Sequence, residues 1–247
     1  MTVARSPDPA PDTDPAAPPA LACPVQAIET ATPAIRIVRL ALPEAASFAH
    51  KAGQYAQLAF DGFAARDYSI ASRPGARVLE FHIRDLGSGP SHYVAQDLQV
   101  GEIVGLRGPF GETYLRPEKP GPILALCGSS GLAPMKAIVE EALALGLRRP
   151  LRLYIGVRRE AEVYLEAHFA SLQAAHPNLS VVYVVSEPTA STGRRTGLVT
   201  DALAADRDSL AGQVGYLAGP PAMVEAGIRL CRELGMAAAD IHADPFD

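Results

Sequence analysis

The hydrophobic pattern of the chain changes near Pro117, and this change most limits the folds available to it. Before that point the apolar residues come in short alternating runs between turn residues. Clear examples are residues 35–40, 54–58 and 78–83. Many short strands with turn signals at this spacing are typical of an antiparallel barrel. We therefore expect an antiparallel β-barrel domain over residues 21–117.

Beyond Pro117 wholly apolar strands alternate with amphipathic helices. Residues 123–127 are the first such strand, followed by a glycine turn and a helix. One face of that helix carries Met135, Ile138, Val139, Ala142 and Leu143. Further strands are expected at 151–157, 181–185 and 214–218, with helices near 163–174 and 222–234. This alternation predicts a Rossmann-like α/β domain with a parallel, doubly wound sheet over residues 118–247.

Composition excludes several classes of protein. With 48% hydrophobic and 20% charged residues, the 247-residue chain is typical of globular proteins. A net charge of −5 argues against a nucleic-acid partner, because duplex binders need clustered Lys and Arg. No apolar run reaches the roughly 20 residues of a membrane span, and the N-terminus lacks a signal-peptide core. We expect a cytoplasmic protein whose Pro- and Ala-rich residues 1–20 form a disordered tail.

The three cysteines give no sign of a metal or a disulfide. Cys23, Cys127 and Cys231 are far apart, and their spacing matches neither a zinc site nor the plant-type iron–sulfur pattern. The histidines show no pairing at helical spacing. We therefore expect no bound metal and buried, structural cysteines.

Two motifs in the barrel half have side chains suited to a flavin nucleotide. Arg66-Asp67-Tyr68-Ser69 offers a guanidinium for a pyrophosphate, a ring to pack on an isoalloxazine, and a hydroxyl that can reach flavin N5. Residues 82–84 (His82, Ile83 and Arg84) then lead into the turn of residues 87–91. That turn ends in Gly89-Pro90-Ser91 at a helix start, where free N–H groups attract phosphate. The alternative interpretations are an ordinary strand with a surface arginine and a plainly capped helix.

Two glycine turns in the second half each follow a strand and begin a helix. The first contains Gly128-Ser129-Ser130-Gly131 and Pro134, and the second contains Gly219-Pro220 and Met223. Neither is a G-x-G-x-x-G fingerprint or a P-loop, but small residues let the backbone approach a dinucleotide. In a parallel sheet both turns lie at the carboxyl edge, where ligands bind.

Taken in this order, the motifs resemble the ferredoxin–NADP reductase superfamily, and within it the reductase components of bacterial aromatic-ring oxygenases. The matching segments are R-x-Y-S at 66–69, the turn through Ser91, G-P-x-G at 108–111, G-x-S-G-L-A-P from Gly128, G-P-P-x-M at 219–223, and the ending at 241–246. The resemblance covers residues 24–247. It implies a Greek-key FAD-binding barrel followed by an NAD(P)-binding domain.

The resemblance also implies roles for individual residues. Ser69 would lie near flavin N5 and Asp244 near the nicotinamide, so both are catalytic candidates. FAD would be held by Arg66, Asp67, Tyr68, Ser69, His82, Ile83, Arg84, Gly89, Pro90 and Ser91, with Phe246 over the flavin face. The dinucleotide would contact Gly128, Ser129, Ser130, Gly131 and Pro134, with Gly219, Pro220 and Met223 closing over its nicotinamide half.

The chain departs from the family at two positions. Ser129 stands where the family commonly has a second glycine in the nucleotide turn, and Ala218 stands where it commonly has a cysteine. Both positions adjoin the expected dinucleotide site. The fused [2Fe–2S] domain of many oxygenase reductases also needs cysteine ligands that this sequence does not supply.

The sequence favours NADH over NADPH. Ser186-Glu187 follows the strand at 181–185, and a carboxylate there accepts from a ribose hydroxyl but repels a 2′-phosphate. Arg158 follows the preceding strand and favours the opposite choice, because a guanidinium pairs with phosphate.

The predicted activity is hydride transfer from nicotinamide C4 to flavin N5, followed by electron release to a separate ferredoxin or oxygenase component. We expect a monomer or weak dimer. One alternative is a flavin reductase that releases its reduced flavin. Others are an electron-transfer subunit without turnover of its own and a non-catalytic dinucleotide sensor.

Overall fold

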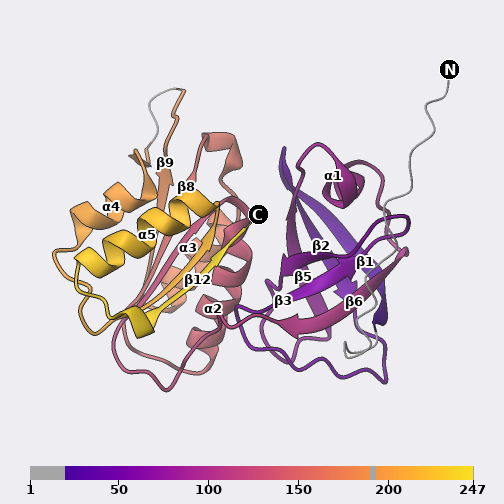
Figure 1. Ribbon diagram of the computed structural model, residues 1–247, viewed down its shortest axis with the longest axis horizontal. Coiled ribbons are helices and arrows are strands. Elements are labelled where there is room, and N and C mark those ends of the chain that lie inside the picture. Colours follow the sequence, from indigo (N-terminus) through magenta and orange to yellow (C-terminus); the bar gives the residue numbers. More distant parts are fainter. Residues whose placement is uncertain (1–19, 190–192, 247) are drawn as a thin grey trace.

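The computed structural model describes residues 20–189 and 193–246, which form two domains placed side by side (Figure 1). The expected tail falls almost wholly on residues 1–19, outside the described residues. The last barrel strand ends at Phe110 and the first strand of the second domain begins at Ile123. The boundary that we expect near Pro117 therefore falls in the connecting segment.

The first domain is an antiparallel barrel of six strands in the order β4-β3-β6-β1-β2-β5. Its strands are β1 (Leu21–Thr32), β2 (Ile35–Ala41), β3 (Tyr55–Ala59), β4 (Arg66–Ser69), β5 (Val78–Arg84) and β6 (Ile103–Phe110). A bridge between Ile70 and Phe81 joins the two ends of the sheet and closes it. Because β6 lies beside β3, the order β6-β3-β4-β5 is a Greek key, and the expected topology is confirmed.

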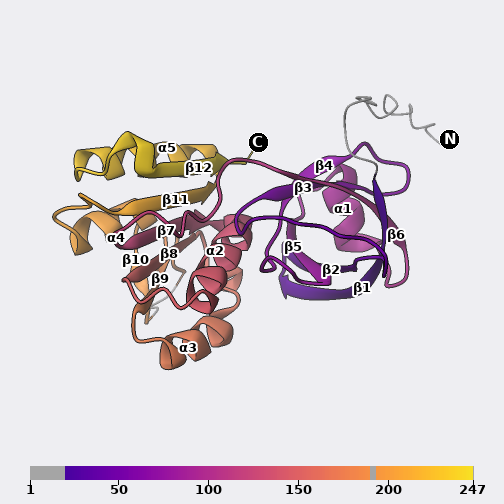
Figure 2. The same cartoon turned by 90° about the horizontal axis from the view of Figure 1, so that it is seen from below.

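Alternation along the strands builds the barrel interior. In β2, Val38 and Leu40 point into the core while Arg39 between them faces outward. The same core holds Leu79, Phe81 and Ile83 of β5. Helix α1 (Gly89–Gln96) packs Val94 against this core and covers one end of the barrel (Figure 2).

The second domain is a three-layer α/β/α structure around a parallel sheet in the order β10-β9-β8-β7-β11-β12. Its strands are β7 (Ile123–Gly128), β8 (Leu151–Val157), β9 (Leu179–Val185), β10 (Arg195–Thr196), β11 (Val214–Gly219) and β12 (Ile241–Pro245). Its helices are α2 (Leu132–Ala144), α3 (Glu166–Ala175), α4 (Val199–Asp206) and α5 (Pro221–Glu233).

The helices cover both faces of this sheet, as expected for a doubly wound domain. Helices α2 and α3 share a core with one face, while α4 and α5 share a second core with the other (Figure 2). Strand β7 is buried along its whole length because it lies between two layers. The parallel, doubly wound fold is confirmed.

Three elements go beyond the sequence-based expectation. Strand β10 has two residues, too few to show a period. Helix α4 buries only Val199, Ala202 and Leu203, so its apolar stripe is short. Strand β12 is an edge strand of half-exposed residues without an apolar run. In all three, contacts distant in sequence decide the structure.

None of the helices in the described part of the chain combines the length and apolarity needed to cross a bilayer. Among residues 20–189 and 193–246 there is also no group of three or more His, Cys, Asp and Glu side chains that could hold a metal ion. The three cysteines are free thiols, and all are buried.

Candidate functional site between the two domains

The two glycine turns of the α/β domain meet where the order of its strands reverses. Strands β7 and β11 are neighbours in the sheet, yet the chain leaves them in opposite directions to build the rest of it. Ligands of open α/β sheets bind in the crevice at this point. The turns that follow the two strands, at residues 128–131 and 219–221, therefore form the floor of a candidate nucleotide site.

Close backbone contact fixes these two turns against each other. A Cβ atom on Gly131 would lie 2.2 Å from the carbonyl oxygen of Ala218, and one on Gly219 would lie 2.7 Å from the carbonyl oxygen of Gly128. Both distances are shorter than any tolerable contact. Glycine is thus required at both positions by the packing of one turn on the other.

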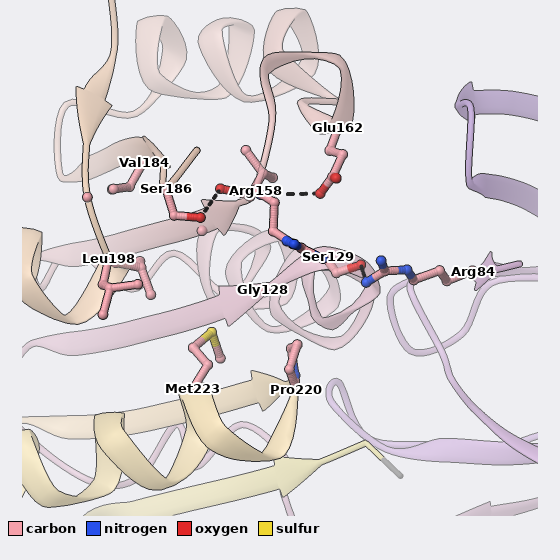
Figure 3. Close-up of a pocket in the computed structure, with 14 residues that line it drawn as sticks. Arg84, Gly128, Ser129, Arg158, Glu162, Val184, Ser186, Leu198, Pro220 and Met223 are labelled. Atoms are coloured by element: carbon pink, nitrogen blue, oxygen red, sulfur yellow. Dashed lines mark hydrogen bonds between the residues drawn. The ribbon is translucent and has the colours of Figure 1, made fainter. Parts of the chain in front are cut away.

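Ser129 and Arg84 connect the nucleotide turn to the barrel. Ser129 adopts a left-handed conformation with φ of 55°, which favours the glycine that the family commonly has there. Its Oγ accepts a hydrogen bond of 3.0 Å from Nη1 of Arg84, which lies at the end of β5 (Figure 3). The departure from glycine therefore gives this chain a polar contact between its two domains.

These residues border a pocket of about 160 Å³ (Figure 3). Its volume is below the roughly 300 Å³ of the smallest usual ligand sites, so it can enclose only part of a dinucleotide. Pro220 and Met223 form one wall. The full lining is Arg84, Gly128, Ser129, Gly156, Val157, Arg158, Glu162, Val184, Ser186, Gly197, Leu198, Val199, Pro220 and Met223.

The start of α2 lies at this crevice and continues a single 3-10 turn over Ser129–Gly131, whose carbonyls accept from the N–H of Leu132. No side chain caps the helix at its N-terminus. The N-terminal end of a helix attracts anions through its dipole and the N–H groups of its first turn. Ser130 is half-buried in the turn, and Pro134 is buried in the first turn of the helix. This cradle fits a pyrophosphate.

The two side chains with opposite preferences for the cofactor bind each other. Arg158 follows β8, Glu187 follows β9, and the guanidinium lies 3.0 Å from Oε1 of Glu187. The backbone N–H of Arg158 also donates to Glu162, 3.2 Å away. The hydroxyl of Ser186 donates a hydrogen bond to the Val157 carbonyl at 3.4 Å. Arg158 thus pairs its guanidinium with Glu187 and its backbone N–H with Glu162.

Strand β4 carries the flavin motif, with Arg66 and Tyr68 on one face and Asp67 and Ser69 on the other. Arg66 is exposed, whereas Tyr68 packs edge-on against Phe60 with ring centroids 6.2 Å apart. Burial raises the pKa of the Tyr68 hydroxyl to about 12, so the ring stays neutral. Ser69 is half-buried and lies opposite Tyr55 of β3. A cation, a neutral ring and a hydroxyl are thus available along one edge of the barrel.

The turn before α1 is open to solvent. Gly87 and Gly89 have φ of 79° and 65°, and a Cβ on either would meet nothing within 4 Å. Pro90 stands in the first turn of α1, and no side chain caps that helix. The hydroxyl of Ser91 is used within the turn, accepting from the N–H of Leu86 and donating to the Ser88 carbonyl. The N–H of Gly87 donates to Oδ1 of Asp85 at 2.7 Å. An open turn and the exposed Arg66 of β4 are what this region offers to the phosphates of FAD.

His82 and Ile83 have no side-chain atoms free for a ligand. The ring of His82 is fully buried, with Nε2 3.1 Å from Oε1 of Glu80 and Nδ1 3.0 Å from the hydroxyl of Tyr164. Ile83 belongs to the barrel core. Both residues can touch a cofactor only through their backbone.

The last strand brings Asp244 and Phe246 to the cleft. Asp244 pairs with Ala218 in the parallel sheet, and the N–H of Phe246 donates to the Gly219 carbonyl at 2.9 Å. Burial, and then the nearby charge of Asp67 on the barrel, raise the pKa of Asp244 to about 6. The same two carboxylates, after burial, raise the pKa of Tyr55. The charge of Asp67 on the barrel thus acts on Asp244 of the second domain.

Sequence reasoning missed a second polar cluster at the domain boundary. It includes Glu80 of the barrel, Lys136 and Glu140 of α2, and Tyr164. One signal was available: Lys136 is the single charged residue in the otherwise apolar run of residues 131–139. The pocket residues Gly156, Leu198 and Val199 carried no such signal.

Two family profiles divide the chain between them. Residues 22–114 match the oxidoreductase FAD-binding domain, and residues 125–227 match the oxidoreductase NAD-binding domain. The matches meet at the connection between the barrel and the α/β domain. The chain therefore has FAD and a nicotinamide dinucleotide as its cofactors.

Curated relatives extend this similarity over nearly the whole chain. The reductase component of the naphthalene 1,2-dioxygenase/salicylate 5-hydroxylase systems of Ralstonia sp., a ferredoxin–NAD(P)+ reductase, is 44% identical over 90% of this chain and 67% of its own. The corresponding component of the Pseudomonas putida naphthalene dioxygenase system is 40% identical over the same shares. The chain thus spans about two thirds of the length of these relatives.

Solved structures show the same arrangement. A cytochrome P450 reductase of Amycolatopsis superposes with a TM-score of 0.86 at 35% identity, over 92% of this chain and 69% of its own. A ferredoxin NADP+ reductase of Neisseria gonorrhoeae superposes with a TM-score of 0.82 at 22% identity, over 92% of this chain and 99% of its own. The second likeness shows the shared fold.

Proposed function

Because this chain belongs to the family of FAD- and NAD(P)H-dependent ferredoxin reductases, we propose that it oxidises NADH on bound FAD and passes electrons singly to a separate ferredoxin or oxygenase component. FAD, when bound, supplies the chemistry that converts a two-electron hydride into single electrons. Everything else is positioning and electrostatics provided by the protein.

One observation carries this proposal: the hydrogen bond from Arg84 to Ser129. Arg84 ends the barrel strand that leads to the FAD phosphate turn, and Ser129 lies in the dinucleotide turn. A 3.0 Å contact between them brings the two nucleotide sites to one boundary. Hydride transfer needs its two rings within about 3–3.5 Å, and only a shared cleft allows this.

Each side chain then has a defined task. Arg66 neutralises the FAD pyrophosphate, and Tyr68 offers a neutral ring to the flavin. With FAD bound, Ser69 would donate a hydrogen bond at flavin N5, and Phe246 would cover the flavin face. Asp244, with its raised pKa, holds a proton near the reacting rings below about pH 6.

The preference for NADH rests on the pairing of Arg158 with Glu187. A guanidinium already paired with the Glu187 carboxylate is less available to a 2′-phosphate. Replacing Glu187 with Gln should release Arg158 and raise kcat/KM for NADPH roughly threefold to tenfold, since exposed ion pairs are weak. A wild-type preference for NADPH would contradict this assignment.

The electron acceptor is proposed from the relatives. The two named reductase components belong to naphthalene dioxygenase systems, and both are ferredoxin–NAD(P)+ reductases. We propose that the present chain, as a monomer or weak dimer, likewise supplies a separate redox protein. A reductase that releases reduced flavin is the second candidate, and retention of yellow colour through gel filtration distinguishes the two. Light scattering on the same column gives the oligomeric state.

An absorption spectrum before and after anaerobic NADH tests the proposed function. Bound FAD should bleach within seconds, and added ferredoxin should restore its colour. Replacing Ser69 with Ala should slow bleaching in stopped flow by roughly tenfold to a hundredfold while FAD stays bound, because one well-placed hydrogen bond is lost. A protein that holds no FAD, or holds FAD that NADH does not bleach, would disprove the proposal.

A further inference from the structure

Lys136 is a buried charge on an otherwise apolar stretch of α2. Only 9% of the residue is exposed. Its Nζ lies 3.2 Å from Oε1 of Glu80, 3.1 Å from Oε1 of Glu140 and 3.3 Å from the carbonyl oxygen of Ala71. The ammonium donates hydrogen bonds to the Ala71 carbonyl and to Oε2 of Glu140, and it forms an ion pair with Glu80. A buried ammonium with partners on three sides is held in one geometry.

The partners of Lys136 come from both domains. Glu140 lies on the same helix, one turn further along, whereas Glu80 and Ala71 belong to the barrel. Ala71 stands two residues after Ser69, on the strand segment that carries the flavin motif. Lys136 itself stands one turn into the helix that begins at the dinucleotide turn. The ammonium therefore connects the supports of the two cofactor sites.

The barrel side of this contact is rigid. Oε2 of Glu80 lies 2.8 Å from Arg39, and Oε1 accepts from His82, whose other ring nitrogen meets Tyr164 of the second domain. Burial acts to raise the pKa of the Glu80 carboxyl, but His82 and the charges of Lys136 and Arg39 hold it well below its usual range. Glu80 is thus an anion with a fixed position on the domain boundary.

The helix side is fixed in the same way. Glu140 is bound by Lys136 and also by Nε2 of His168 on α3, 2.6 Å away. After the opposing effect of burial, these two contacts lower the pKa of Glu140. The whole cluster, defined as Arg39, Glu80, His82, Lys136, Glu140, Tyr164 and His168, crosses the boundary twice, once through Lys136 and once through Tyr164.

We propose that Lys136 is a positioning residue for hydride transfer, whose ammonium sets the dinucleotide turn at a fixed distance from the strand that carries Ser69. This rests on the proposed function. The chemistry is sensitive to such a contact, since a displacement of about 1 Å between reacting groups lowers a rate by roughly a hundredfold. Lys136 touches neither cofactor site. It acts through the two backbone segments that it joins, which are helix α2 and the segment that contains Ala71.

Replacing Lys136 with Met tests the proposal, because methionine keeps the length and removes the three donors. Glu80 keeps Arg39 and His82, and Glu140 keeps His168, so neither carboxylate is left alone. We expect FAD content and the KM for NADH to stay within roughly twofold, and the limiting rate of FAD reduction to fall roughly tenfold or more. Lys136→Arg, which keeps the charge, should recover part of that rate.

Two readouts separate positioning from a general loss of structure. The long-wavelength absorption band that stacked nicotinamide and flavin rings produce should weaken in Lys136→Met. Amide hydrogen exchange should rise in the segments around Ala71 and Lys136 but stay unchanged in the outer strands of both sheets. Where Lys136→Met fails to fold, Glu80→Gln provides the same test. The new amide keeps an acceptor for Lys136 but removes the negative charge at position 80.

Arg73 gives the matched control. Its Nε lies 3.0 Å from Oε2 of Glu141, the residue after Glu140 in α2, so this pair joins the same two domains. In contrast to Lys136, 48% of the Arg73 side chain is exposed. Arg73→Gln should leave the limiting rate and the stacking band unchanged, because exposed pairs contribute little.

The outcome that overturns the inference is an unchanged limiting rate and stacking band in folded Lys136→Met or Glu80→Gln. An equal loss of rate in Arg73→Gln would also overturn it, because the rate would then depend on any contact between the domains and not on Lys136 in particular. Failure of the proposed function looks different, since the wild-type protein itself would then not be reduced by NADH.

Discussion

The proposed FAD turn at residues 87–91 and the proposed dinucleotide turn at residues 128–131 both contain glycines, but for different physical reasons. Around α1, Gly87 and Gly89 stand in open space and are glycine because the backbone there is left-handed. In the α/β domain, Gly131 has an ordinary φ of −58° and is glycine because the Ala218 carbonyl leaves no room for a Cβ atom. The first turn needs conformational freedom, and the second needs the absence of a side chain.

The difference shows how each wall of the cleft keeps its shape. The barrel wall, which is the turn of residues 87–91, is an open loop with free space around its glycines, so a small error there stays local. The sheet wall consists of the turns at residues 128–131 and 219–221, which are in close backbone contact. A side chain that does not fit there would therefore displace β7 and β11 together. The two walls should therefore respond very differently to the same added methyl group.

Gly131→Ala should have the largest effect. Its Cβ would lie 2.2 Å from the Ala218 carbonyl, so the two turns must separate, at a cost of about 3 kcal/mol or more. Gly89→Ala, with φ of 65° but free space, should cost about 1–2 kcal/mol from backbone strain alone. Chemical denaturation measures both costs. NADH affinity should fall in the first variant and stay normal in the second; equal costs would remove the distinction between the turns.

Asp244 and Asp67, one in each domain, extend the comparison to pH. The pKa of Asp244 is raised from 3.8 to about 6. The folded state therefore binds this proton more tightly than the unfolded state, and the resulting stability is present below pH 3.8 and lost as pH rises through about 6. After allowance for solvent screening, Asp244→Asn should gain about 1–2 kcal/mol relative to the wild type between pH 4 and pH 7.

Asp67 is the control for that prediction. Asp67→Asn removes the charge that assists burial in raising the pKa of Asp244, so the same pH-dependent difference should shrink without disappearing. Denaturation of the FAD-loaded proteins at several pH values measures it. A difference that is flat with pH for Asp244→Asn would show that the carboxylate ionises normally.

Ser129→Gly should have the smallest effect. The change relieves the left-handed serine by about 1 kcal/mol and removes the acceptor for Arg84, which stabilises by about the same amount. Stability should stay within about 0.5 kcal/mol of the wild type, and the KM for NADH should change by less than about threefold. A large loss in either would mean that the contact between the domains, and not the backbone, governs this turn.

Much of the architecture could be predicted from local pattern. The alternation around Val38 and Leu40 specified barrel strands, and the continuous apolar run of β7 specified a buried parallel strand. The strand–turn–helix at Gly128 located the dinucleotide crevice because parallel strands end at a common edge. These features depend on neighbours in sequence, which is why the pattern contains them.

The finer features of the site depend on contacts between distant residues. Nothing near Gly131 in sequence indicates that Ala218 lies against it, and nothing near Arg158 indicates that Glu187 takes up its charge. His82 was expected at a cofactor because it lies in a flavin motif, but burial beside Glu80 and Tyr164 gives its ring another role. Lys136 could have been noticed as a lone charge on an apolar helix, but its partners could not.

The hydrogen bond from Phe246 to Gly219 has a practical consequence. It places the end of the described chain beside the dinucleotide turn, between the two domains, while β1 begins on the far side of the barrel (Figure 1). An affinity tag or fluorescent fusion attached after Phe246 would leave from the mouth of the cleft and compete with the nicotinamide for space. Purification handles and surface anchors belong at the other terminus.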